Sequence, residues 1–149
     1  MSSLYPVWWD TTITIYNKYE NTSTNVITWY GTVIPLCFWK YVGDSINQTL
    51  TQEDKYDTIC RIPENPLYVP NYLWKDLSEL DKASHFTVNL DDIIIKGYVT
   101  DTINEYTAGK RSTDIIDKYK KLQGCITVKE FAIDTGEGRC LPHYRIYGI

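Results

Sequence analysis

An alternating run near the start of the chain constrains the fold more than any other feature. Within residues 12–19, Ile13 and Ile15 share one face of an extended chain, while threonine and tyrosine side chains occupy the other. The polar cluster 20–25 can satisfy its own backbone groups through Asn, Ser and Thr side chains, which is typical of a turn. Residues 26–33 then return to β-branched and aromatic composition. The sequence therefore predicts a β-hairpin.

Short runs of similar composition recur along the chain, and turn residues separate them. We expect Pro35 to interrupt the second strand of the hairpin, and Ile93-Ile94-Ile95 has the pattern of a strand that is buried on both faces. The further strands are predicted at 36–42, 56–62, 86–88, 93–100, 126–133 and 143–147. This spacing indicates a mainly β fold, an antiparallel β-sandwich or small barrel with one or two short helices and long loops.

The clearest helical pattern lies between residues 112 and 124. Ser112 or Thr113 can cap the first turn, the last turn is rich in lysine, and Gly124 can adopt the left-handed conformation that ends a helix. A weaker pattern predicts a short helix within 75–83. The apolar stripe of the main helix is Ile115, Ile116, Tyr119 and Leu122. The side chains that we expect to be buried are Trp29, Ile94, Ile115 and Tyr119.

Length and charge limit the classes of function. A chain of 149 residues is the size of one domain, and we expect an amino-terminal arm at 1–11 and a single β-rich domain at 12–149. The net charge of −4 disfavours a protein that grips nucleic acid, because such a grip needs a concentrated basic surface. No apolar run approaches the roughly 18 residues of a membrane span. The first residues lack the features of a secretory signal, so the cysteines are expected to be reduced thiols.

Residues that could carry chemistry are few. Cys125, Cys140 and His143 would supply three of the four ligands of a zinc site, and the alternative is buried thiols with a surface histidine. Asp91 and Asp92 are adjacent, so on a strand they would point to opposite faces and could not form an acid–base pair. They are expected to form a polar turn. The sequence thus predicts a protein that is not an enzyme and needs no cofactor or metal.

Candidate contact residues lie on the arm and on two long connections. Large aromatic side chains dominate protein interfaces, so Trp8 and Trp9 are candidates, although this arm could equally fold back and cap the core. Long loops on a rigid β scaffold often contact partners, and the alternative for each is a solvated excursion. The loop candidates are Asp44, Ile46, Asn47 and Leu50 in the connection 43–54, and Tyr106, Lys110 and Arg111 in the connection 101–111.

Four segments together resemble a family of small tailed-bacteriophage proteins that are encoded among the head–tail connector genes. They are Ile15–Glu20, Trp29–Ile34 with Trp39 after it, Asp92–Gly97 and Leu141–Gly148. In combination these segments are specific, and they span most of the chain. The positions that match the family pattern are Tyr16, Asn17, Tyr19, Trp29, Trp39, Gly97, His143 and Gly148. The tryptophan-bearing start of the chain departs from that pattern, and the resemblance brings no catalytic residues with it.

The resemblance implies a structural role in the virion neck, assembled in the host cytoplasm. The expected protein is a head-closure (stopper) or adaptor subunit between portal and tail, acting as a homo-oligomeric ring of six or twelve copies. Its expected partners are portal or adaptor and tail proteins, with genomic DNA passing nearby without sequence-specific binding and with no membrane. A negative channel lining would keep DNA from adhering. The alternatives are a tail terminator, a capsid-decorating protein and, from a different class, a small metal-binding or enzymatic module.

Overall fold

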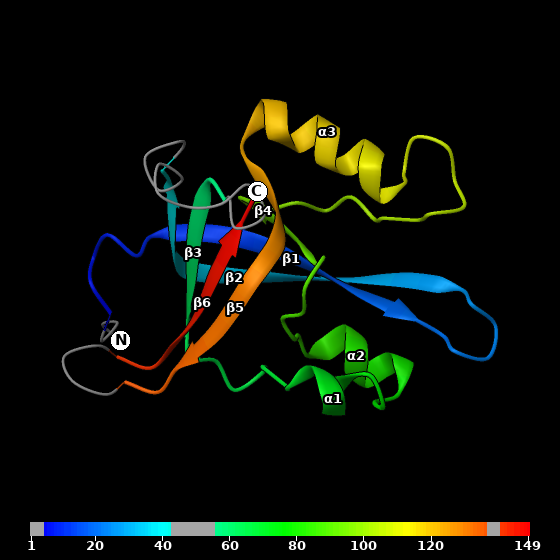
Figure 1. Ribbon diagram of the computed structural model, residues 1–149, viewed down its shortest axis with the longest axis horizontal. Helices are drawn as coiled ribbons and strands as arrows, with labels where there is room; N and C mark the ends of the chain where they lie inside the picture. Colours follow the sequence, from blue (N-terminus) through cyan, green and yellow to red (C-terminus); the bar gives the residue numbers. More distant parts are fainter. Residues whose placement is uncertain (1–4, 43–55, 137–140) are drawn as a thin grey trace.

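Six strands form a closed antiparallel barrel in the computed structural model, which describes residues 5–42, 56–136 and 141–149 (Figure 1). The strand order around the barrel is β1-β2-β3-β6-β5-β4, and β4 pairs with β1 to close it. The strands are β1 (Thr11–Glu20), β2 (Ile27–Tyr41), β3 (Thr58–Pro63), β4 (Ile93–Lys96), β5 (Cys125–Asp134) and β6 (His143–Gly148). The helices are α1 (Asn71–Trp74), α2 (Glu79–Ser84) and α3 (Ser112–Leu122). The prediction of a mainly β fold is confirmed. Of the two predicted architectures, the structure has the small barrel and not the sandwich.

The interior of the barrel is filled by alternate residues of each strand. On β1, Ile13 and Ile15 point inward and are completely buried, as the alternation predicted. The same cluster takes in aliphatic side chains of β2, β3, β4, β5 and β6, together with Phe86 and Val88 from the segment before β4. Because each strand contributes one face to a common interior, removing any one of them would expose the others to water.

A second apolar cluster lies outside the barrel, beneath α3. Ile93 and Ile95 point outward into this cluster while Ile94 points into the barrel, so the predicted burial of this strand on both faces is confirmed. From α3, Ile115 and Tyr119 pack onto the same outer face, and both are buried as expected. Figure 1 shows α3 on one side of the barrel and the short helices α1 and α2 on the other.

The β1–β2 hairpin is longer than the barrel and projects from it (Figure 1). Strand β4 pairs with β1 only along 13–16, and β3 pairs with β2 only along 38–41. The distal half of the hairpin pairs 17–20 with 27–30. Trp74 of α1 is fully buried against this half, with its ring edge-on to Tyr30 at 5.7 Å between ring centroids. The helical segment therefore supports the projecting half of the hairpin.

Three predicted element boundaries are wrong for identifiable reasons. Pro35 does not divide β2, because a register irregularity in its pairing with β1 and a left-handed Leu36 (φ 60°) let the strand continue past the proline. The predicted strand 93–100 ends at Lys96, since Gly97 adopts φ 105°. The short helix expected at 75–83 is instead two helices, α1 and α2, on either side of 75–78.

The ends of α3 illustrate one prediction that is confirmed and one that is not. Gly124 has φ 107° and its N–H donates to the Tyr119 carbonyl at 2.9 Å, so it ends the helix as expected. Ser112 does not cap the other end, because it is already helical. The carboxylate of Glu105 accepts from the Ser112 backbone N–H at 2.6 Å and from its hydroxyl at 2.9 Å. An acidic side chain from the preceding loop thus replaces the expected cap.

Candidate functional site

A buried carboxylate ties the hairpin to the turn before β4. Asp92 is only 1% exposed, and it accepts hydrogen bonds from the Lys18 backbone N–H (3.0 Å), the Asn17 side-chain amide (2.9 Å) and the Asn89 backbone N–H (2.9 Å). Burial raises the pKa of Asp92 to about 7, although these three donors act in the opposite direction. The expectation of a polar turn at Asp91 and Asp92 holds for the exposed Asp91, whereas Asp92 belongs to the interior.

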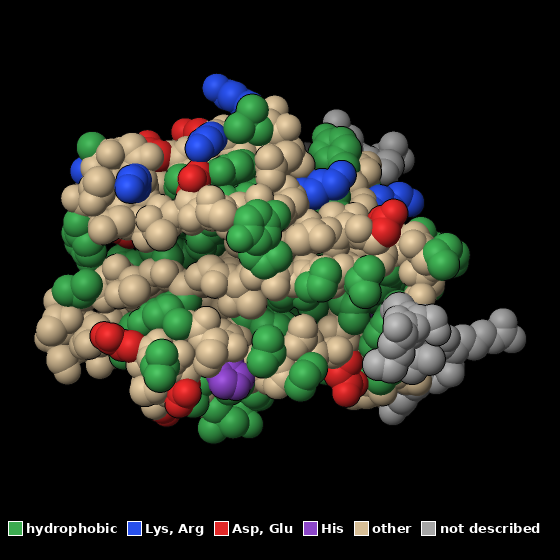
Figure 2. All heavy atoms as spheres, turned by 180° about the vertical axis from the view of Figure 1, so that it is seen from behind, with side chains coloured by type: hydrophobic (Ala, Val, Ile, Leu, Met, Phe, Trp, Pro, Cys, Tyr) green, Lys and Arg blue, Asp and Glu red, His purple; other side chains and the backbone are tan. Residues whose placement is uncertain are grey.

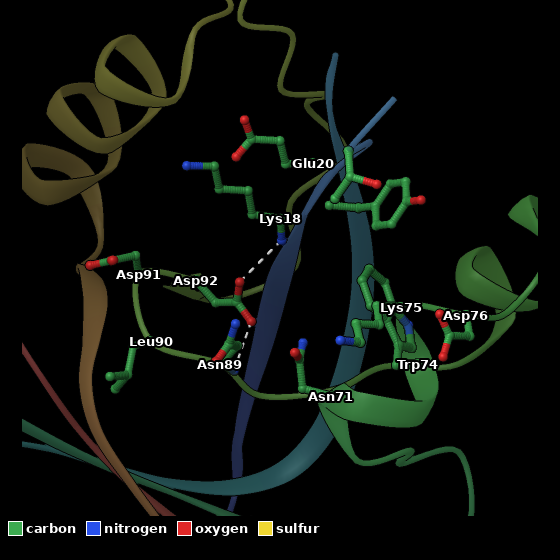
Figure 3. Close-up of a pocket in the computed structure, with 12 residues that line it drawn as sticks. Lys18, Glu20, Asn71, Trp74, Lys75, Asp76, Asn89, Leu90, Asp91 and Asp92 are labelled. Atoms are coloured by element: carbon green, nitrogen blue, oxygen red, sulfur yellow. Dashed lines mark hydrogen bonds between the residues drawn. The ribbon is translucent and has the colours of Figure 1, made fainter. Parts of the chain in front are cut away.

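A cleft of about 480 Å³ opens above this carboxylate, between the distal half of β1, α1 and the turn before β4 (Figure 3). Its walls carry both signs of charge. The charged lining residues are Lys18, Glu20, Lys75, Asp76, Asp91 and Asp92. With three donors already on Asp92, its carboxylate offers almost no surface to a molecule in the cleft. The geometry favours a structural role for Asp92 over acid–base chemistry.

On β1 and β2, the positions of the family pattern build the fold. The Tyr16 hydroxyl donates to the Asp101 carbonyl at 2.5 Å, and burial raises the pKa of Tyr16. Asn17 is completely buried, and its side chain bridges Asp92 and the Thr87 backbone. Trp29 was expected to be buried, but it is only partly so, because it packs at the margin of the α3 cluster.

Tyr19 belongs to a buried cation–aromatic arrangement that sequence reasoning missed. The Lys82 ammonium lies 4.1 Å from the Tyr19 ring centroid and 5.8 Å from that of Trp74, and it donates to the Leu77 carbonyl at 2.5 Å. Lys82 is 4% exposed. These contacts hold α2 against the hairpin.

The remaining pattern positions also have structural roles. The left-handed Gly97 donates its N–H to the Thr12 carbonyl at 2.6 Å. At Gly148 a Cβ would lie 2.7 Å from the Thr127 carbonyl oxygen, which is closer than atoms can approach. Trp39 is partly buried, and it packs against the barrel core.

His143 is buried, which corrects the expectation of a surface histidine. It is 5% exposed, its Nδ1 lies 2.8 Å from the Leu141 carbonyl oxygen, and its Nε2 lies 3.9 Å from Asp134. The Trp9 ring meets it edge-on at 5.5 Å between centroids. A pocket of about 480 Å³ adjoins this histidine, and Tyr68 and Tyr144 help to line it.

The two tryptophans of the arm have different environments. Trp9 is 8% exposed and stacks on Tyr5, with 5.1 Å between ring centroids, so this part of the arm caps the barrel. Tyr5 itself hydrogen-bonds to the Pro142 carbonyl and to the Glu64 backbone N–H. Trp8 is 65% exposed and remains available for a contact with another molecule.

Of the two connections with candidate contact residues, the structure describes 101–111 but not 43–54. Asp44, Ile46, Asn47 and Leu50 lie outside the described residues. In the other loop, the hydroxyl of Tyr106 accepts from the Ile27 backbone N–H at 2.9 Å, while its side chain is 62% exposed. Lys110 and Arg111 are exposed beside the start of α3.

Two of the three residues considered as zinc ligands, Cys125 and His143, lie far apart in the part of the chain that the structure describes. Cys125 begins β5 and pairs with Ile95, whereas His143 pairs with Asp134 at the other end of the same strand. At roughly 3.3 Å per residue, these ends are about 30 Å apart. Cys140 lies outside the described residues. No group of three potential metal ligands occurs among the residues described, and no helix among them could span a membrane.

Two surface features stand on opposite sides of the barrel. On α2, Leu80 is 80% exposed and lies between Glu79 and Asp81. At the carboxyl end of α3, a hollow of about 330 Å³ has Trp39 and Tyr41 among its lining residues. Figure 2 shows the lysine and arginine side chains of the visible face gathered in its upper half, the half where α3 lies.

Comparison with known proteins places the chain in one family. A family model described as a family of unknown function (DUF6751) matches residues 8–149, which is nearly the whole chain. No curated protein and no solved structure matches.

Proposed function

We propose that this chain, which belongs to the DUF6751 family of unknown function, is a structural subunit of the head–tail connector of a tailed bacteriophage. It would form a ring of six or twelve copies as a head-closure or adaptor layer between portal and tail. The four sequence segments that resemble connector-encoded phage proteins motivate this proposal. The virion neck would be its location, after assembly in the host cytoplasm.

The structural observation that supports the proposal is the exposure of several large apolar side chains outside a closed barrel. In the described part of the chain, the strands are paired on both sides where the barrel closes, so that part of the wall has no free edge. Contacts on the closed part of the wall must use side chains. Val7 and Trp8 are neighbours on the arm and are 90% and 65% exposed, and Leu80 on α2 is 80% exposed. These side chains are candidates for contacts with other copies.

A head-to-tail ring suits such a molecule. One small subunit, repeated by rotation about a channel, closes a ring when each copy presents two different and complementary surfaces. The closed barrel gives a stiff body, and the projecting half of the hairpin extends the reach of each copy. The net charge of −4 is compatible with DNA passing through the channel without adhering.

Electron microscopy of virions with a tag on this chain tests the proposal. Density of the tagged chain at the single neck vertex, as a ring between portal and tail, is the expected result. Density over the whole shell would identify a decorating protein instead, and density at the top of the tail tube would identify a tail terminator. Virions in which the chain is absent would overturn the structural role itself.

A further inference from the structure

We propose that the apolar projection on α2 of one copy docks into the hollow at the end of α3 of the next copy. The occupant of the hollow is thus a second copy of this chain. This inference rests on the proposed function, because it supplies the contact by which a ring of identical subunits would close.

The projection combines an apolar tip with acidic flanks. Leu80 is the most exposed large apolar side chain of the helical segment, and Tyr72 on α1 is 67% exposed. Glu79 and Asp81 flank Leu80 directly, and both are exposed. Among the exposed charged side chains of the segment 64–92, five are acidic and one is basic. A partner for this surface should therefore offer an apolar cavity with positive charge beside it.

The hollow combines aromatic side chains with two lysines. Its volume of about 330 Å³ is many times the roughly 10–15 Å³ that a single water needs, so a side chain can enter it. Trp39 and Tyr41 supply aromatic surface, and Tyr41 is 70% exposed. Lys96 and Lys120 also line it, and within the described part of the chain neither lysine forms a salt bridge. Asp57 is the acidic lining residue, and its carboxylate accepts from the Thr58 hydroxyl.

The two surfaces are arranged for contact between copies. Figure 1 places α1 and α2 below the barrel and α3 above it, so Leu80 cannot reach the hollow of its own chain. Contact between unlike surfaces of identical chains is heterologous, and it generates a ring when the rotation closes. The apolar tip would supply the buried area, while Glu79 and Asp81 facing Lys96 and Lys120 would set the orientation.

Disulfide trapping tests the contact even where association is transient. All chains carry Cys140→Ser, since the other three cysteines are buried. Chains with Leu80→Cys are mixed with chains with Tyr41→Cys under mild oxidation. We expect covalent dimers to form about tenfold faster than in a control mixture in which Ile133→Cys, which is also exposed, replaces Tyr41→Cys. Equal rates in the two mixtures would overturn the proposal.

Charge reversal checks the orientation. Adding Glu79→Lys with Asp81→Lys to the Leu80→Cys chain should slow trapping about tenfold, because like charges then face each other. Adding Lys96→Glu with Lys120→Glu to the Tyr41→Cys chain should restore the rate. If reversal at the lysines alone slows trapping while reversal on α2 does not, the hollow receives another surface and the pairing proposed here is wrong.

The outcomes separate this inference from the proposed function. Failed trapping together with neck density in virions would remove this interface and leave the connector role standing. Specific trapping together with absence from virions would leave the self-association and remove the connector role.

Discussion

The buried Asp92 carboxylate makes the stability of the fold depend on pH in an unusual direction. Burial raises its pKa to about 7 in the folded chain, whereas an aspartate in an unfolded chain titrates near 3.9. Between these values the folded state binds more protons than the unfolded state. The free energy of unfolding therefore falls as pH rises from about 4 to about 7. The contribution of Asp92 is fully present below this window and lost above it.

The size of the effect follows from the difference between the two pKa values. About three units at 1.36 kcal/mol per unit gives about 4 kcal/mol over the whole window, and about 2.5 kcal/mol between pH 5 and pH 8. Asp92→Asn removes the titration. The asparagine amide also places its own N–H groups where three N–H donors bond to the Asp92 carboxylate, so hydrogen bonds are lost. This loss lowers the free energy of unfolding by about 1–3 kcal/mol at every pH.

Urea unfolding followed by circular dichroism between pH 5 and pH 8 measures both the pH-dependent contribution of Asp92 and the constant cost of the substitution. Relative to wild type, we expect the Asp92→Asn variant to gain about 2.5 kcal/mol in free energy of unfolding as pH rises across this range. Asp91→Asn is the matched control, because the Asp91 side chain is 71% exposed and asparagine tolerates its left-handed backbone. A difference for Asp92→Asn that stays constant with pH, or falls, would refute the reasoning.

Four further variants test the fold. Ile94→Asp should prevent folding, since it buries an unpaired charge in the barrel; a soluble protein with a cooperative thermal transition would contradict this. Gly148→Ala should lower the free energy of unfolding by about 1–3 kcal/mol, because its Cβ would overlap a carbonyl oxygen, and an unchanged urea midpoint would count against it. Trp9→Ala should cost about 3 kcal/mol and Trp8→Ala less than about 0.5 kcal/mol; equal melting temperatures for these two variants would contradict the packing of the arm.

Local patterns predicted the hairpin, the isoleucine strand and α3, because the residues that decide each of them are neighbours in the sequence. Closure of the barrel could not be predicted in this way. It depends on pairing of 13–16 with 93–96, which lie about eighty residues apart. The same strands could have formed two packed sheets. Pro35 was misjudged for a related reason, since tolerance of a proline depends on the register irregularity that the neighbouring strand permits.

The buried polar residues left a signal in the sequence that went unused. Asn17 lies on the same face of β1 as Ile13 and Ile15, so alternation already placed an amide on the buried face of this strand. Asp92 directly precedes three buried isoleucines. A buried amide and a buried carboxylate each require a partner, and pairing them would have predicted their contact. Lys82 gave no comparable signal, because its burial depends on aromatic rings from other elements.

The positions that carry the resemblance mostly hold the barrel together, and this determines where contacts with other molecules should be sought. Four of these positions form internal hydrogen bonds, ring contacts or close packing, namely Asn17, Gly97, His143 and Gly148. A side chain that is buried in this way cannot also form an interface. Contacts with other molecules should therefore be sought among exposed side chains, whether these lie inside or between the four segments. Leu80 on α2, which is 80% exposed and lies outside the four segments, is such a side chain, and this is why the trapping experiment begins from it.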